Sequence, residues 1–175
     1  MNIREEILKE HSKKQALKIS GWIGNNTDRF RQLIDIFLHD EYRVVQRSAW
    51  VVGHVAEKYP EMVKPFLPKI VNRLYDNNIH TAVKRNVVRI LQFIPVPKRL
   101  QAKVMNKCLD YLNDPIETIA VRCFSMTVLT NLAMKYPEIK NEVIASINIS
   151  IKYSTPGYRA RAKKELKQLE KLPAN

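Results

Sequence analysis

Apolar residues recur along this chain at spacings of three and four, with polar residues between them. That spacing gathers apolar side chains on one face of a helix, whereas strands would show strict alternation, which no run of the chain sustains. We therefore predict an all-α fold. The pattern predicts helices at about 3–10, 12–23, 29–38, 43–58, 60–74, 81–94, 98–112, 117–135, 138–152 and 157–172.

Boundary residues support this division. Ser12 and Gln15 have the spacing of a capping box, in which two side chains satisfy free amides at the start of a helix. Asp28 is predicted to cap the third helix, and the pair Pro65 and Pro68 is predicted to bend the fifth, because proline removes a helical hydrogen bond.

One stretch of the chain returns at a fixed distance. The segment 45–56, VQRSAWVVGHVA, is echoed 38 residues later from Val83 and again from Val121. A second echo, AEKYPE at 56–61, returns as AMKYPE at 133–138, two periods and one residue later. Repetition near 40 residues in a helical pattern indicates stacked helical hairpins. We predict a right-handed α-α superhelix of about four to five hairpins.

No linker or change of composition interrupts the series, so residues 1–175 are predicted to form a single domain. Its expected parts are an N-terminal half-hairpin at 1–11, repeat units at 12–39, 43–76, 81–112 and 117–153, and a basic C-terminal helix at 155–172.

The repeat resembles the HEAT repeat family, with some armadillo character. That family places an Asp in the turn within a hairpin and opens the next helix with Val-Arg-x-x-Ala. Here Asp40 precedes VQRSA at 45–49, Asp76 precedes VKRNV at 83–87, and Asp114 precedes VRCFS at 121–125. The resemblance implies a binding scaffold, in which the basic residue of this motif can pair with the turn Asp of a neighbouring repeat.

Charge is the main compositional signal. The chain has 30 Lys and Arg against 17 Asp and Glu, a net charge of +13. Such a surplus favours a polyanionic partner, although lysine-rich faces also keep a protein soluble. Residues 77–109 hold seven basic residues and no acidic one. No apolar run is long enough to span a membrane, and Cys108 and Cys123 suit reduced core thiols, so we expect a cytoplasmic protein without a cofactor or metal.

The second helix of each hairpin is expected to line a concave face, where solenoids usually bind their partners. One stripe of these helices carries cations and one indole, which could contact phosphates and stack on a base. Arg47 and Arg85 have the alternative structural role just described. The predicted groove residues are Lys14, Lys18, Arg47, Trp50, His54, Arg85, Arg89, Gln92, Arg122, Met126, Arg161 and Lys164.

A more distant resemblance links the chain to the HEAT-like DNA alkylation repair fold, whose glycosylases combine a basic concave face with tryptophans and a concave carboxylate. No acidic residue of helices 43–58, 81–94 or 117–135 is placed to lie beside Trp50. Nucleotide-binding, zinc-protease and serine-hydrolase motifs are also absent. We therefore predict a protein that is not an enzyme and has no small-molecule substrate.

The sequence thus favours a binding or scaffold module with a basic groove for a polyanion, nucleic acid being preferred. Two alternatives stay open: a scaffold for an acidic peptide or helix, and a compact alkylation-repair glycosylase. The first would leave the groove indifferent to DNA and RNA, and the second would make base release depend on Trp50.

Overall fold

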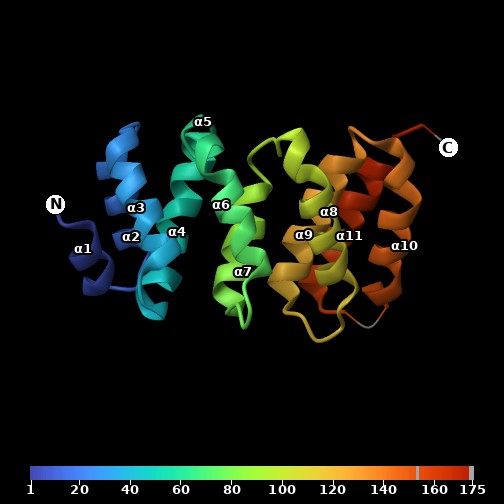
Figure 1. Cartoon of the computed structure of the whole chain (residues 1–175). Helices are drawn as coiled ribbons and strands as arrows, with labels where there is room; N and C mark the ends of the chain where they lie inside the picture. The colour runs from blue at the N-terminus through green and yellow to red at the C-terminus, as the bar shows by residue number, and fades with distance from the viewer. Residues whose placement is uncertain (153, 174–175) are drawn as a thin grey trace. The chain divides into compact units, whose positions relative to one another are not determined.

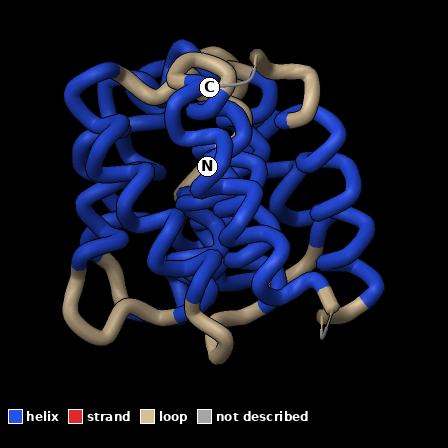
Figure 2. The backbone as a smooth tube through the Cα atoms, turned by 90° about the vertical axis from the view of Figure 1, so that its right-hand side faces the viewer, coloured by secondary structure: helices blue, strands red, loops and turns tan. Residues whose placement is uncertain are grey.

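The computed structural model describes residues 1–152 and 154–173, and among them every regular element is a helix (Figures 1 and 2). The predicted all-α class is confirmed. The chain divides into two compact units, Met1–Pro95 and Val96–Asn175. The first contains α1 (Ile3–Lys9), α2 (Lys13–Ile23), α3 (Thr27–His39), α4 (Tyr42–Lys58), α5 (Pro60–Val63), α6 (Leu67–Asn72) and α7 (Thr81–Leu91). The second contains α8 (Lys98–Asn113), α9 (Ile119–Ala133), α10 (Lys140–Ile151) and α11 (Pro156–Leu169).

Two predicted helix starts differ from the structure in their capping residues. Ser12 caps α2 as expected, since its Oγ accepts a hydrogen bond from the Gln15 amide at 3.1 Å. The Gln15 side chain, however, bonds Glu6 in α1 and leaves the capping box half made. Asn26, and not Asp28, caps α3, because its Oδ1 accepts from the Arg29 amide at 2.9 Å.

The predicted bend in the helix from residue 60 takes the form of two interruptions. Helix α5 passes at Val63 into a 3₁₀ turn, Lys64–Phe66, which contains Pro65. Helix α6 then begins at Leu67 with Pro68 in its first turn, where a missing N–H costs nothing, and ends in a second 3₁₀ turn, Arg73–Tyr75. The prolines therefore divide one expected helix into short segments.

Helix α4 is the centre of the first unit. It packs against α1, α2, α3, α5 and α7. The predicted apolar stripe of Val45, Ala49, Val52 and Ala56 is at most 3% exposed. Contacts on several sides also bury Val44, Val51 and Val55, so α4 is apolar around most of its circumference.

Helix α9 has the same position in the second unit, where it packs against α8, α10 and α11. Its buried residues include Val121, Val128, Leu129 and Leu132. Within each unit, helices that follow one another pair as hairpins: α1 with α2, α3 with α4, α8 with α9, and α10 with α11. The division into repeat units at 12–39, 43–76, 81–112 and 117–153 stays a prediction, and residue 153 lies outside the described residues.

The end of α2 provides a paired stability test. Gly24 has φ of +52° and donates its N–H to the Ser20 carbonyl, whereas Gly21, within α2, has open space around the position of a Cβ atom. We expect Gly24→Ala to lower the free energy of unfolding by about 1–2 kcal/mol, because an L side chain is strained at positive φ. Gly21→Ala should raise it by about 0.5–1 kcal/mol, since it reduces backbone entropy in the unfolded chain. Urea unfolding measures both, and equal effects of the two substitutions would contradict this account.

Candidate functional site

Arg47, Trp50 and His54 lie one turn apart along α4, on the strip of this helix that its neighbours leave partly open. All three are half-buried, while Val51, Val52 and Val55 beside them are fully buried. We call these three residues the α4 stripe. Its position is as predicted, but its side chains are engaged with the protein.

Arg47 caps another helix. Its Nη1 donates to the carbonyl oxygens of Ile7 at 3.2 Å and Leu8 at 2.9 Å, in the last turn of α1. Carbonyls at a helix C-terminus have no intrahelical partner, so this guanidinium satisfies groups that α1 leaves open. Arg47 is therefore a structural residue.

The turn aspartates have other partners than the resemblance implies. Asp40 pairs with Arg4 of α1 at 2.8 Å, and the Arg4 guanidinium lowers the pKa of this carboxyl. Asp76 pairs at 2.6 Å with Arg73, three residues before it. The family pairing of the motif Arg with a turn Asp is thus replaced at Arg47 by bonds to main-chain carbonyls.

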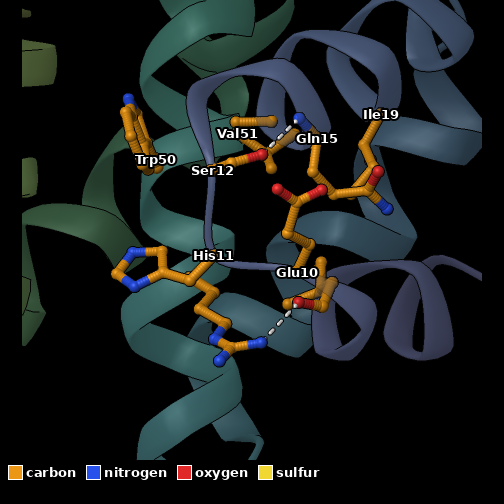
Figure 3. A pocket seen from close by; sticks show the side chains of 10 residues that line it. Glu10, His11, Ser12, Gln15, Ile19, Trp50 and Val51 are labelled. Atoms are coloured by element: carbon orange, nitrogen blue, oxygen red, sulfur yellow. Dashed lines mark hydrogen bonds between the residues drawn. The ribbon is translucent and has the colours of Figure 1, made fainter.

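Trp50 lies between two histidines. His11, from the loop between α1 and α2, meets the indole edge-on at a centroid distance of 5.6 Å (Figure 3). His54 lies on the other side at 6.4 Å. A pocket beside the indole is also lined by Glu10, a carboxylate that a search confined to the inner helices misses. The volume of this pocket is about 10 Å³, no more than one water requires, so it cannot hold a nucleobase.

His54 has a buried ring nitrogen, Nε2, with no hydrogen-bond partner among the described residues. Burial lowers the pKa of this imidazole, and the positive charge of Arg89 lowers it further. The ring is therefore held neutral beside α7, which suits a packing role for His54 and not that of a cation on a binding surface.

The remaining predicted residues of the first unit differ in their freedom. Lys14 of α2 and Arg85 of α7 are exposed. Lys18 pairs with Glu6 at 3.0 Å, and Arg89 lies 3.8 Å from Glu57. The side chain of Gln92 donates to the Arg89 carbonyl at 3.2 Å.

Two predicted groove residues of the second unit are buried, and this part of the prediction is wrong. Arg122 is 4% exposed and Met126 is 0% exposed. The Nε and Nη2 atoms of Arg122 both donate to the Leu112 carbonyl at 3.2 Å, Nη2 also donates to Ser150, and the guanidinium lies 5.0 Å from the centre of the Tyr158 ring. Such a buried guanidinium joins α8, α9, α10 and α11.

The error is one of register. The partly open strip of α9 contains Phe124, Thr127 and Asn131, which follow Arg47, Trp50 and His54 by 77 residues. The predicted positions had been stepped along α9 from the 38-residue echo at Val121. The echo of AEKYPE at 133–138 carries the extra residue and would have found the correct strip.

Helix α11 presents a row of cations to solvent. Arg161 is engaged, since its Nη1 donates to Thr127 Oγ1 at 2.7 Å, but Lys164 is exposed as predicted. Of the two acidic residues in this region, Glu165 is only 1% exposed, and its Oε1 accepts from the Thr127 hydroxyl at 2.7 Å. The exposed basic residues are Arg159, Lys163, Lys164, Lys167 and Lys171.

Among the described residues, no group of three or more His, Cys, Asp or Glu side chains is arranged to hold a metal ion. None of the helices they form combines the length and apolar character that crossing a membrane requires. Cys108 and Cys123 are both buried free thiols, and burial raises the pKa of Cys108 to about 12. A thiol with so high a pKa is a poor nucleophile at neutral pH.

Repeated helical hairpins, packed around α4 and around α9, define the chain as an α-helical repeat protein. A family model of the HEAT repeat domain matches residues 3–169, and the chain belongs to this family of helical interaction scaffolds. Searches of curated proteins and of solved structures gave no match.

The different positions of Arg47 and Arg85 can be compared directly. We expect Arg47→Met to lower the free energy of unfolding by about 1–3 kcal/mol, because it leaves the Ile7 and Leu8 carbonyls without their donor while keeping an apolar stem. Arg85→Met, at an exposed site, should change it by less than about 0.5 kcal/mol. Urea unfolding at neutral pH is the measurement. A larger loss at Arg85 than at Arg47 would reverse their assigned roles.

Glu6 gives the first unit a defined pH dependence. Hydrogen bonds from Lys9, then from Lys18 and Gln15, lower the pKa of its carboxyl from 4.5 to about 2. Since the folded pKa is the lower one, the stabilisation is complete above about pH 4.5 and is lost as the pH falls toward 2. We expect Glu6→Gln to flatten the fall in unfolding free energy over this range, measured by urea unfolding at several pH values. The exposed carboxylate Glu10, changed to Gln, is the control, and an equal flattening there would refute the role of Glu6.

Proposed function

We propose that this HEAT repeat domain is a non-catalytic scaffold that binds a polyanion, and that the polyanion is nucleic acid. The observation that carries the proposal is the solvent-exposed surface of α11. Burial of Glu165 removes a carboxylate from this surface and leaves Lys163, Lys164 and Lys167 outside. Cations spaced along a helix can each contact a phosphate and release its counterions.

A second basic surface in the first unit supports the proposal. It consists of Lys14 and Lys18 on α2 and Arg85 and Arg89 on α7, and α4 packs against both helices. Lys14 and Arg85 are the exposed members, while Lys18 and Arg89 share their charge with Glu6 and Glu57. We call this set the α2/α7 basic face.

A catalytic role has less support. The pocket beside Trp50 is too small for a base, and Trp50 is flanked by His11 and His54. The partly open indole remains available for stacking at its exposed edge only, so phosphate contacts and not base contacts dominate the proposed binding. The proposal includes a cytoplasmic location, which the two buried free thiols support.

The test is binding of a labelled DNA duplex and a labelled single strand, followed by fluorescence anisotropy at about 50 and 200 mM salt. If about four phosphates are neutralised, affinity should fall roughly 100-fold across this range. The double variants Lys163→Glu with Lys167→Glu, and Lys14→Glu with Arg85→Glu, should each weaken binding by about tenfold or more at the lower salt.

A matched control reverses two cations on outer helices, Arg31→Glu in α3 and Lys69→Glu in α6, with the same change in net charge. This variant should retain most of the affinity, because its residues lie outside both basic surfaces. Equal losses in the control would reduce the effect to net charge. Absence of binding to either strand form at 50 mM salt would overturn the nucleic-acid proposal and favour an acidic protein segment.

A further inference from the structure

The second unit contains a pocket that is unlike the basic surfaces. It has a volume of about 270 Å³ and lies between α8 and the segment that runs from the end of α9 into the 3₁₀ turn Pro137–Ile139. Its wall is formed by Ala102 and Met105 of α8 together with Leu132 and Ile139. An apolar cavity of about 150 Å³ holds a benzene ring, so this pocket has room for one large apolar side chain.

The polar groups in the pocket wall are already bonded to one another. The Tyr136 hydroxyl donates to Gln101 Oε1 at 2.6 Å, and Gln101 Nε2 donates to the Val96 carbonyl at 2.8 Å. A polar ligand would therefore have to displace these bonds, whereas an apolar group only has to cover the side chains of Met105, Leu132 and Ile139. Burial of apolar surface is the available driving force.

The rim of the pocket is mostly basic. Lys98 lines it, Arg99 is exposed on the next position of α8, and Lys135 is exposed just before Tyr136. The helix has no acidic residue before Asp110. Glu138 is the one carboxylate in the lining. A partner that places an apolar side chain in this pocket would gain from carboxylates on either side of it.

We propose that this pocket binds a segment of a partner protein in which one large apolar residue is flanked by acidic residues. The inference goes beyond nucleic-acid binding, because the site lies on other residues and has another driving force. A nucleobase fits it less well, since its polar edges would meet Gln101 and Tyr136 in bonds that are already made.

The test is a methyl NMR titration of the full chain with a decapeptide that has a central leucine flanked by glutamates. Chemical-shift changes should concentrate on Met105, Leu132 and Ile139 and follow a single binding curve. A decapeptide with alanine in place of the leucine should bind at least tenfold more weakly, as expected when one buried leucine is lost. Lysines in place of the glutamates should also weaken binding, by about tenfold or more at low salt.

Two variants separate the pocket from the rest of the surface. Ala102→Glu places a charge in the pocket wall, and Ala145→Glu places the same charge at an exposed position of α10. Both alanines are exposed, so both variants should fold, which circular dichroism checks. Ala102→Glu should reduce peptide affinity tenfold or more, and Ala145→Glu should leave it nearly unchanged. Equal effects of the two variants, undiminished binding of the alanine peptide, or shifts spread over other methyl groups would overturn the proposal.

Discussion

Packing on several sides of α4 and α9 is the constraint on which the rest of this protein depends. A helix with one buried face can display polar residues over half its surface, but a helix enclosed by neighbours keeps only a narrow strip open. On α4 that strip holds Arg47, Trp50 and His54, and on α9 it holds Phe124, Thr127 and Asn131. Everything that these central helices can offer a partner must come from such a strip.

The same packing determines which charges reach the surface. A buried carboxylate needs donors, and Glu6 and Glu165 both have them: Glu6 from Lys9, Lys18 and Gln15, and Glu165 from Thr127. Each of these acids therefore contributes little negative charge to the exterior, while the lysines nearby stay outside. The basic character of the exposed surface exceeds what the composition alone indicates, and it follows from the packing.

The sequence predicted the helices well because their signals are local. Apolar spacing, Ser12, Gly24 and the prolines act within one or two turns, and the structure has a helix wherever the pattern indicated one. Even the exceptions are local, as when Asn26 caps α3 two residues before Asp28.

Contacts between distant segments were not predictable in the same way. The bonds of Arg47 to α1 join residues 39 and 40 positions apart. The pocket of the second unit is built from α8 and from residues about 30 positions later, and no motif marks it. Arg122 and Met126 were misplaced because a repeat of 38 residues had been carried along α9 without the extra residue that the second echo contains.

The motif arginines also show why a shared sequence pattern does not imply a shared role. Helix α1 ends after Lys9 in extended backbone, which leaves the Ile7 and Leu8 carbonyls open to Arg47, and α8 ends so that Leu112 meets Arg122. In the hairpin that contains Arg85, the outer segment ends instead in a 3₁₀ turn, where the Asp76 amide bonds the Arg73 carbonyl at 3.3 Å. A tightened last turn satisfies its own carbonyl and needs no arginine from another helix. Arg85 is consequently left at the surface, where its charge is available to a partner.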